Sequence, residues 1–387
     1  MSLEQWVLEM RRRFHEYPEL GNLEYETTDI IEKELKSMGI ETKRLLPTGV
    51  LGIFRGTKLV FNHEGEVEKP RVIALRADID ALEIIEDTGL AFSSKNAGLM
   101  HACGHDAHAA ILLGVAKALS ERKNTLTDVV KFIFQPAEES TGGAERMIAA
   151  GCMQDPNVDY IFGLHVMPDI LAGCVGVKFG KMYASSDMVN ITVHGVSGHG
   201  AFPETSIDAV VVAAAIITNI QSIVSRNISV TSPCIITFGS IHGGTANNII
   251  ANKVEIKGTI RTLDPESRTF VQKRIHEMVR GIASAMGATV DIVYLRGYNA
   301  LINDQDSVEL VYSASCDAVG EDKIVHTSEA YMGGEDFSFY LGHAKGAFFG
   351  LGCGYPDRNN SGLHSTTFDL DESCLPIGVE IFCRLVK

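Results

Sequence analysis

The segment from Met100 to His108 concentrates side chains that can bind a metal ion. It reads Met-His-Ala-Cys-Gly-His-Asp-Ala-His, so three histidines, a cysteine and an aspartate fall within eight residues. Thiolate and imidazole groups are strong ligands for first-row metal ions, and Asp106 could orient an imidazole as a hydrogen-bond acceptor. A surface loop with chance histidines is the alternative, but this density of ligand types favours a metal site.

An acidic pair, Glu138 and Glu139, follows the apolar run at 129–134. Adjacent side chains on an extended or turning chain point in different directions, so one carboxylate can bind a metal while the other acts as a general base. Alone, such a pair is more often a solvated loop. Because the pair and the Cys/His segment both follow strands of one predicted sheet, we expect them to meet.

Two later histidines complete a candidate ligand set. His165 follows the apolar run at 160–164, and His364 follows the polar loop at 357–360. Each is unremarkable alone. The five candidate ligands are Cys103, His105, Glu139, His165 and His364. Five ligands exceed the needs of one tetrahedral ion and suit two metal ions, which in such sites lie about 3.5–4 Å apart.

Further polar groups have weaker signals. Asp78 closes the apolar run at 72–75 and either holds a metal-bound histidine in one tautomer or forms a strand-end salt bridge with Arg76. His199 lies in a Gly-rich turn, and a second such turn at 243–248 contains Asn248. Glycine lets the backbone approach a ligand, although Gly-rich turns are commonly just turns.

The elements that must position these residues alternate between strand and helix. Short apolar, β-rich runs lie at 50–54, 72–75, 129–134 and 160–164, with helical segments at 105–120 and 143–150 between them. The stretch up to Met38 is expected to be helical, with an interruption at Pro18. This alternation predicts an α/β domain with a central, largely parallel sheet flanked by helices.

The middle of the chain follows a different order. Strand and helix patterns at 187–194, 206–225, 234–242, 253–262, 265–286 and 288–294 give the sequence βαββαβ. This order is typical of a ferredoxin-like α+β unit. We therefore expect a discontinuous catalytic domain, 1–181 and 298–387, with an inserted lid or dimerisation domain at 182–297.

Composition excludes several classes of protein. Lys and Arg total 34 against 49 Asp and Glu, so the formal net charge of −15 argues against a partner that is a nucleic acid. The longest apolar run, 209–217, is well short of the roughly 18 residues of a membrane helix. No secretory signal is recognisable, and the eight cysteines lack Cys-x-x-Cys spacing, so we expect reduced thiols and a cytoplasmic protein without membrane partners.

Taken in order along the chain, these motifs resemble those of the metal-dependent aminoacylase and amidohydrolase family, a branch of the dinuclear-metal peptidases. That family includes hippurate hydrolases, auxin-conjugate hydrolases and N-acetyldiaminopimelate deacetylases. The resemblance runs nearly end to end and rests on the segments 13–21, 75–82, 100–108, 135–139, 163–165, 198–199, 333–337 and 363–365.

The resemblance implies that the same five ligands hold two divalent ions, with manganese, zinc, cobalt or nickel as candidates. It implies that Glu138 is the general base and that His199 stabilises the transition state, in some relatives across a dimer. It also implies that Asn248 and Arg261 hold the substrate carboxylate. Two lid positions depart from the family pattern, Glu204 and Asn247, and both bear on substrate preference.

The expected reaction is hydrolysis of an N-acyl amino acid by a metal-bound hydroxide, with Glu138 as general base. The family implies N-acetyl, N-benzoyl or similar substrates, and a homodimer or homotetramer through the lid is one expected assembly. Two alternatives stay open: a dipeptidase or carboxypeptidase on the same scaffold, and a non-catalytic binding protein that retains the fold. A zinc nucleobase deaminase is disfavoured because no Pro-Cys-x-x-Cys motif is present.

Overall fold

The computed structural model describes residues 1–387, which form two compact units. The first unit consists of Met1–Gly180, Ile302–Ser328 and Phe339–Lys387. The second consists of Lys181–Leu301 and Glu329–Ser338. The chain therefore enters the second unit twice, and the short segment 329–338, which falls within the predicted catalytic range 298–387, groups with the second unit.

An eight-stranded sheet organises the first unit, with the order β1-β2-β4-β3-β5-β16-β6-β15. Its four central strands are parallel to one another: β4 (Val129–Gln135), β3 (Val72–Asp78), β5 (Tyr160–Leu171) and β16 (Lys345–Gly354). The outer strands are β1 (Glu41–Lys43), β2 (Val50–Arg55), β6 (Val175–Val177) and β15 (Ile324–His326). Pairing is antiparallel at β1–β2, β2–β4 and β16–β6, so the sheet is mixed but largely parallel, as predicted.

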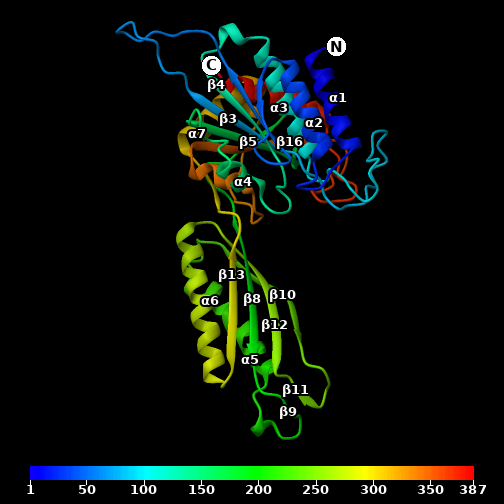
Figure 1. Ribbon diagram of the computed structural model, residues 1–387, viewed down its shortest axis with the longest axis vertical. Helices are drawn as coiled ribbons and strands as arrows, with labels where there is room; N and C mark the ends of the chain where they lie inside the picture. Colours follow the sequence, from blue (N-terminus) through cyan, green and yellow to red (C-terminus); the bar gives the residue numbers. More distant parts are fainter. The chain divides into compact units, whose positions relative to one another are not determined.

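Helices cover this sheet, and every residue of β3 and β4 is buried, as expected for strands enclosed on both faces. The helices are α1 (Leu3–Glu16), α2 (Tyr25–Ser37), α3 (His105–Ser120), α4 (Gly143–Ala149), α7 (Gln305–Val319) and α8 (Leu375–Leu385) (Figure 1). The central helix α3 is buried along almost its whole length. It packs so closely against α1 that a Cβ on Gly114 would lie 2.6 Å from a methyl group of Val7.

The second unit contains a four-stranded antiparallel sheet with two helices. The strand order is β10-β12-β8-β13, formed by β8 (Ser185–His194), β10 (Cys234–Gly243), β12 (Lys253–Thr262) and β13 (Thr289–Arg296). Helix α5 (Ala209–Ser222) follows β8, and α6 (Pro265–Ala285) follows β12 (Figure 1). The connectivity is βαββαβ, which confirms the ferredoxin-like prediction.

Two sequence-based expectations need correction. The strand β5 continues to Leu171, so His165 lies inside a strand, paired with Gly350 of β16, and not after a strand end. The helical stretch Ala209–Asn227 contains an 18-residue window with a mean hydropathy of 1.6, so it is long and apolar enough to cross a membrane by length and composition, which the unbroken apolar run at 209–217 alone did not indicate. In the structure this stretch begins with α5, whose inner side, including Val212 and Ile216, is buried in the core of the second unit.

Candidate metal centre

The first unit brings together all five predicted ligands. The donor atoms of Cys103, His105 and His165 lie within 4.8 Å of one another, and so do those of Cys103, Glu139 and His364. Within this cluster the thiol Sγ lies 3.4 Å from His165 Nε2, and His364 Nε2 lies 2.9 Å from Glu139 Oε1. The cluster can therefore hold a metal ion, and two overlapping groups of three donors are suited to a pair of ions.

Local backbone geometry brings these side chains to one place. Gly104 adopts a left-handed conformation (φ 82°) directly before α3, and a Cβ there would lie 2.3 Å from a methyl group of Val166. After β4, Ala137 has a φ of 58°, which turns the chain before the acidic pair. His364 also has a positive φ, 62°, and its backbone N–H donates to Ala102 O at 2.8 Å. Such strained non-glycine residues concentrate at functional sites.

The imidazoles of His105 and His165 are oriented for metal binding. Nδ1 of His105 lies 3.0 Å from the carbonyl oxygen of Asp80 and 3.1 Å from its Oδ1, and Nδ1 of His165 lies 2.8 Å from Val166 O. Each Nδ1 is therefore assigned the proton, which leaves each Nε2 as the ligand atom. Nε2 of His105 is buried and has no hydrogen-bond partner. A buried nitrogen without a partner, beside a thiol and a carboxylate, fits a bound metal ion.

His108 is not available as a ligand, although it lies beside the cluster. Its Nδ1 is 2.6 Å from Asp78 Oδ1, and its Nε2 accepts the backbone N–H of Val166 at 3.0 Å. Both ring nitrogens are thus engaged. Asp78 also forms a buried ion pair with Arg76 at 2.6 Å. Asp78 therefore forms the salt bridge with Arg76 and also holds the Nδ1 of a histidine, as the two alternatives predicted. That histidine is His108, which is not a candidate ligand.

Asp80 is the residue that sequence reasoning missed. It is buried, its Oδ1 faces His105 Nδ1, and its Oδ2 accepts the backbone N–H of Glu139 at 2.9 Å. One carboxylate thus connects the loop after β3 with a ligand at the start of α3 and a ligand in the loop after β4. The sequence did contain a signal for Asp80. It lies two residues after Asp78, at the carboxyl end of a central strand, where the loops of the site meet.

Asp106 has a different partner from the one expected. It orients an imidazole, but that of His15 in α1, with Nδ1 2.8 Å from Asp106 Oδ2. The same Oδ2 accepts from Arg11 Nε at 2.9 Å. Asp106 is the second residue of α3, so its side chain points away from the cluster to which its neighbour His105 belongs.

The protonation of the cluster is coupled to metal binding, since burial opposes the charge on His105 but Asp78 outweighs it and raises the pKa of that imidazole. Burial lowers the pKa of His165 to about 3, so its imidazole is neutral, as a metal ligand must be. Burial raises the pKa of the Cys103 thiol well above its usual value, so metal binding must displace its proton. Burial also opposes ionisation of Glu139, but His364 and His105 outweigh it and lower the pKa of that carboxyl.

The remaining predicted site residues, His199, Asn248 and Arg261, belong to the second unit. The short strands β9 (Gly198–His199) and β11 (Ile249–Ile250) pair antiparallel, with His199 opposite Ile249 and Gly200 N–H donating to Asn248 O at 2.9 Å. His199 and Asn248 are therefore neighbours in space. Arg261 lies near the far end of β12, eight residues beyond Lys253, or roughly 25 Å along a strand. The structure does not bring Arg261 to Asn248.

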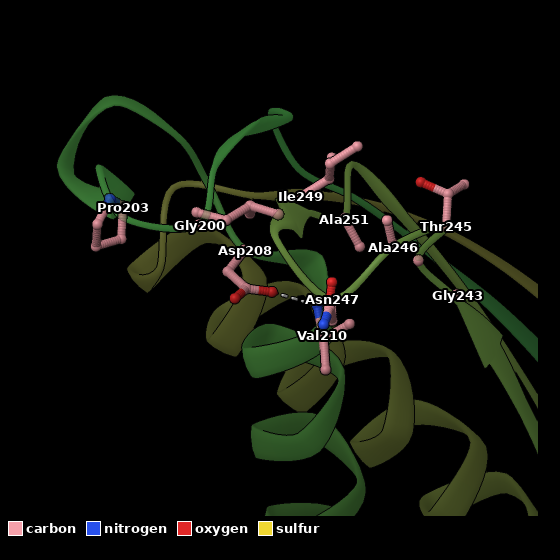
Figure 2. A pocket seen from close by; sticks show the side chains of 12 residues that line it. Gly200, Pro203, Asp208, Val210, Gly243, Thr245, Ala246, Asn247, Ile249 and Ala251 are labelled. Atoms are coloured by element: carbon pink, nitrogen blue, oxygen red, sulfur yellow. Dashed lines mark hydrogen bonds between the residues drawn. The ribbon is translucent and has the colours of Figure 1, made fainter.

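A cavity of about 600 Å³ lies beside these paired strands. Figure 2 shows it between the Gly-rich 243–247 turn, Gly200, Pro203 and the start of α5. Asp208 is the only charged residue in its lining, and its carboxylate already accepts from the backbone N–H groups of Val210 and Val211. The cavity contains no metal-ligand cluster and no cation for a substrate carboxylate.

Comparisons with known proteins agree with this site. Residues 74–387 match the model of the peptidase family M20/M25/M40. An N-acetyl-L-cysteine deacetylase of Bacillus subtilis is 38% identical, covering 97% of this chain and 86% of the relative. Thermostable carboxypeptidase 1 of Saccharolobus solfataricus is 37% identical over 97% and 93% of the two chains.

A solved structure is also similar. The YXEP protein of Bacillus subtilis, described as a dinuclear metal binding peptidase from the M20 family, superimposes with a TM-score of 0.83 at 34% identity, covering 99% and 97% of the two chains. Sequence, fold and donor cluster thus lead to one conclusion: this chain belongs to the peptidase family M20/M25/M40.

Proposed function

We propose that this protein is a metal-dependent amidohydrolase that cleaves N-acyl amino acids to a carboxylic acid and a free amino acid. The observation that carries the proposal is the placement of Glu138 within 4.8 Å of His105 and Glu139, inside the donor cluster. A deacetylase is among its relatives at 38% identity. Hydrolysis of an amide needs an electrophile for the acyl oxygen and a base for the attacking water, and this cluster offers residues for both.

We assign Cys103, His105, Glu139, His165 and His364 as ligands to two divalent ions. When bound, the ions would polarise the acyl oxygen and lower the pKa of water. The metal is manganese, zinc, cobalt or nickel in this proposal, and the thiolate ligand favours the softer zinc ion.

Glu138 takes the role of base. The residue is buried, with 8% exposure, so bulk water has little access to its carboxylate. A carboxylate oxygen of Glu138 would accept the proton of the attacking water and then donate it to the departing amide nitrogen. Glu139, held through its backbone by Asp80, keeps its carboxylate for metal binding.

The lid residues are proposed to bind the substrate. His199 is exposed and its Nδ1 accepts the N–H of Ala201 at 3.1 Å, so its Nε2 can donate to the oxyanion. Because Asn248 lies beside β9 and β11, before β12 begins, and Arg261 lies near the far end of β12, one subunit cannot use both on a single carboxylate. A shared role for them therefore requires two subunits.

A homodimer through the second unit is consistent with its surface. From Ala209 to Ser225 no side chain is charged, and Val210 and Val211 on α5 are 46% and 53% exposed. Helix α5 packs over β10, which is a free edge of the sheet. An uncharged helix beside an unpaired strand edge is a surface that a second copy would cover. With eight free cysteines, we further propose a cytoplasmic location.

The deciding experiment measures relative kcat/KM for N-acetyl, N-benzoyl and N-indoleacetyl amino acids after reconstitution with each candidate metal. A carboxypeptidase or dipeptidase is the second candidate, because a relative named thermostable carboxypeptidase is 37% identical. Faster cleavage of a dipeptide than of the matching N-acetyl amino acid would favour it. Absence of all amide hydrolysis with every metal would favour a non-catalytic binding protein.

A further inference from the structure

The segment from Arg11 to Glu24, here called the N-terminal brace, contacts the first turn of α3 and the loops after β3 and β4, all of which carry residues of the metal centre or its support. It spans the end of α1 and the turn before α2. Its residues include the 13–21 motif, to which the proposed reaction assigns no role. Each residue that it contacts is adjacent in sequence to a candidate ligand, to the proposed base or to Asp80.

The first contact is the buried ion network at Asp106. Arg11 and His15 stand one helical turn apart on α1, and both reach Asp106 Oδ2, at 2.9 and 2.8 Å. Arg11, His15 and Asp106 have fully buried side chains. Each of these two side chains also binds a second carboxylate. Arg11 Nη1 lies 3.0 Å from Glu372, and His15 Nε2 lies 3.2 Å from Glu86. Asp106 adjoins the candidate ligand His105.

The second contact is made by the backbone. The N–H of Ala81 donates to Glu19 O at 2.8 Å, and Leu20 forms a parallel bridge with Ala81. Ala81 follows Asp80, whose carboxylate holds His105 and the N–H of Glu139.

The third contact is the carboxylate of Glu24. It is fully buried, and its Oε1 accepts the backbone N–H of Ala137 at 2.8 Å. Ala137 has the positive φ that redirects the chain before Glu138. Gly21 lies against the same turn, because a Cβ there would lie 2.4 Å from Ser140 Oγ and 3.0 Å from Ala137 Cα. The brace is therefore fitted to this turn with no room for a side chain at Gly21.

Stability alone is a poor reason for this arrangement. Removing ions from water is costly, and well-packed apolar residues often replace a buried ion network without loss of stability. Apolar contacts are not directional, so they do not fix the orientation of a loop. Hydrogen bonds to a carboxylate are directional and hold a loop within a narrow range of positions. Metal ligands need such fixed positions, and loss of outer partners typically costs about 10–100-fold in metal affinity or activity.

We infer that the N-terminal brace positions the metal-binding loops, with Arg11 and His15 acting through Asp106 and Glu24 acting through the Ala137 amide as positioning residues. This inference rests on the proposed function for its ligand assignment. None of these residues touches the substrate in the proposal. They act by fixing the positions of the metal ligands and of Glu138.

The test measures Co²⁺ affinity by titration, followed through the absorption of a cobalt–thiolate bond, which reports Cys103 itself. Asp106→Ala and Glu24→Ala are expected to weaken Co²⁺ binding by about 10–100-fold and to lower kcat more than they raise KM. Glu24→Gln keeps an acceptor for the Ala137 N–H and should bind Co²⁺ within about threefold of wild type.

The matched control is Asp187→Ala in the second unit. Asp187 is likewise fully buried and paired with an arginine, Arg268, and its side chain is hydrogen-bonded to residues of the second unit. Its loss should lower the melting temperature and leave Co²⁺ affinity unchanged. If Asp106→Ala does not fold, the Glu24→Ala and Glu24→Gln pair decides by itself.

The inference is overturned if the alanine variants bind Co²⁺ as wild type does, or if Asp187→Ala weakens binding equally. It is also overturned if Glu24→Gln fails to restore affinity. Because Co²⁺ binding needs no substrate, wild-type protein that binds Co²⁺ but hydrolyses no N-acyl amino acid would remove the proposed function and leave this comparison valid. Wild-type protein that binds no Co²⁺ would overturn both.

Discussion

Asp80 holds the ring of His105 through two acceptors, its own carbonyl oxygen at 3.0 Å and its Oδ1 at 3.1 Å from Nδ1. The second carboxylate oxygen accepts the N–H of Glu139. One side chain therefore fixes the direction of one candidate ligand and the backbone of another. Asp80 therefore supports the metal centre more directly than Asp78 and Asp106, the two acids that the sequence indicated for this role.

Replacing Asp80 with alanine is therefore expected to weaken metal binding. His105 would lose one of its two acceptors, and the Glu139 amide would lose its only side-chain acceptor. We expect metal affinity to fall about 10–100-fold, measured by competition with a chelator. Asp128→Ala is the control, because Asp128 is equally buried but lies before β4, where it binds Arg71 and the Lys387 N–H. Equal affinities in both variants would contradict the assignment.

The acidic pair divides its roles, so its two members should fail differently when changed. Glu138→Gln removes a base but no proposed ligand, and kcat should fall by about 10²–10⁴-fold while metal content stays at the wild-type level. Glu139→Gln removes a proposed ligand, and metal content should fall. Mass spectrometry of the bound metal together with steady-state kinetics separates the two. A near-wild-type rate for Glu138→Gln would disprove its role as base.

The sequence predicted the frame of the site well, because the frame depends on local pattern. Helix α3 spans the predicted range 105–120, and β12 spans the predicted range 253–262. Four of the five ligands could be collected because they follow central strands, in the loops or at the helix start beyond them, whereas His165 lies inside β5. These positions meet at one edge of a parallel sheet whatever the details of packing.

What the sequence could not give is the pairing of polar groups across the fold. Asp78 and Asp80 are two residues apart, and only the register of β3 beside α3 decides that the first meets His108 and the second His105. The partnership of Asp106 with His15 joins positions 91 residues apart through helix packing. Hydrophobic periodicity carries no information about such long-range contacts.

Lys131 gives the protein an unusual response to alkali. It lies fully buried in β4 and donates to the carbonyl oxygens of Cys152 and Gln154. Burial lowers its pKa from 10.5 to about 8. Between these values the unfolded chain binds more protons at this site than the folded chain, so the contribution of Lys131 to the free energy of unfolding should rise with pH. Below about pH 8 that contribution should be at its lowest.

Lys131→Met isolates this effect because methionine fills similar space without titrating. The difference in free energy of unfolding, wild type minus variant, should increase as pH is raised from 8 to 10.5, measured by urea denaturation at each pH. Lys123→Met on the surface serves as the control and should show a flat difference. A flat difference for Lys131→Met as well would mean that the buried amine keeps its ordinary pKa.

The two helices of the second unit offer an internal test of the proposed dimer. Both lie on one face of the same sheet, yet the outer side of α6 carries Lys273, Glu277 and Arg280, whereas the exposed residues of α5 are uncharged, with valine and alanine in its first half and Thr218, Asn219 and Gln221 in its second. A charge placed on α5 would be buried without a partner in a dimer, at a cost of several kcal/mol, and would be harmless in a monomer. Val211→Glu should therefore shift a dimer to monomer in sedimentation, while Gln272→Glu on α6 should not.

If both variants sediment as wild type does, α5 is not the contact between subunits. If Val211→Glu separates the subunits and also lowers kcat/KM, the substrate-binding role of the lid residues depends on the second copy, as the distance between Asn248 and Arg261 within one subunit requires.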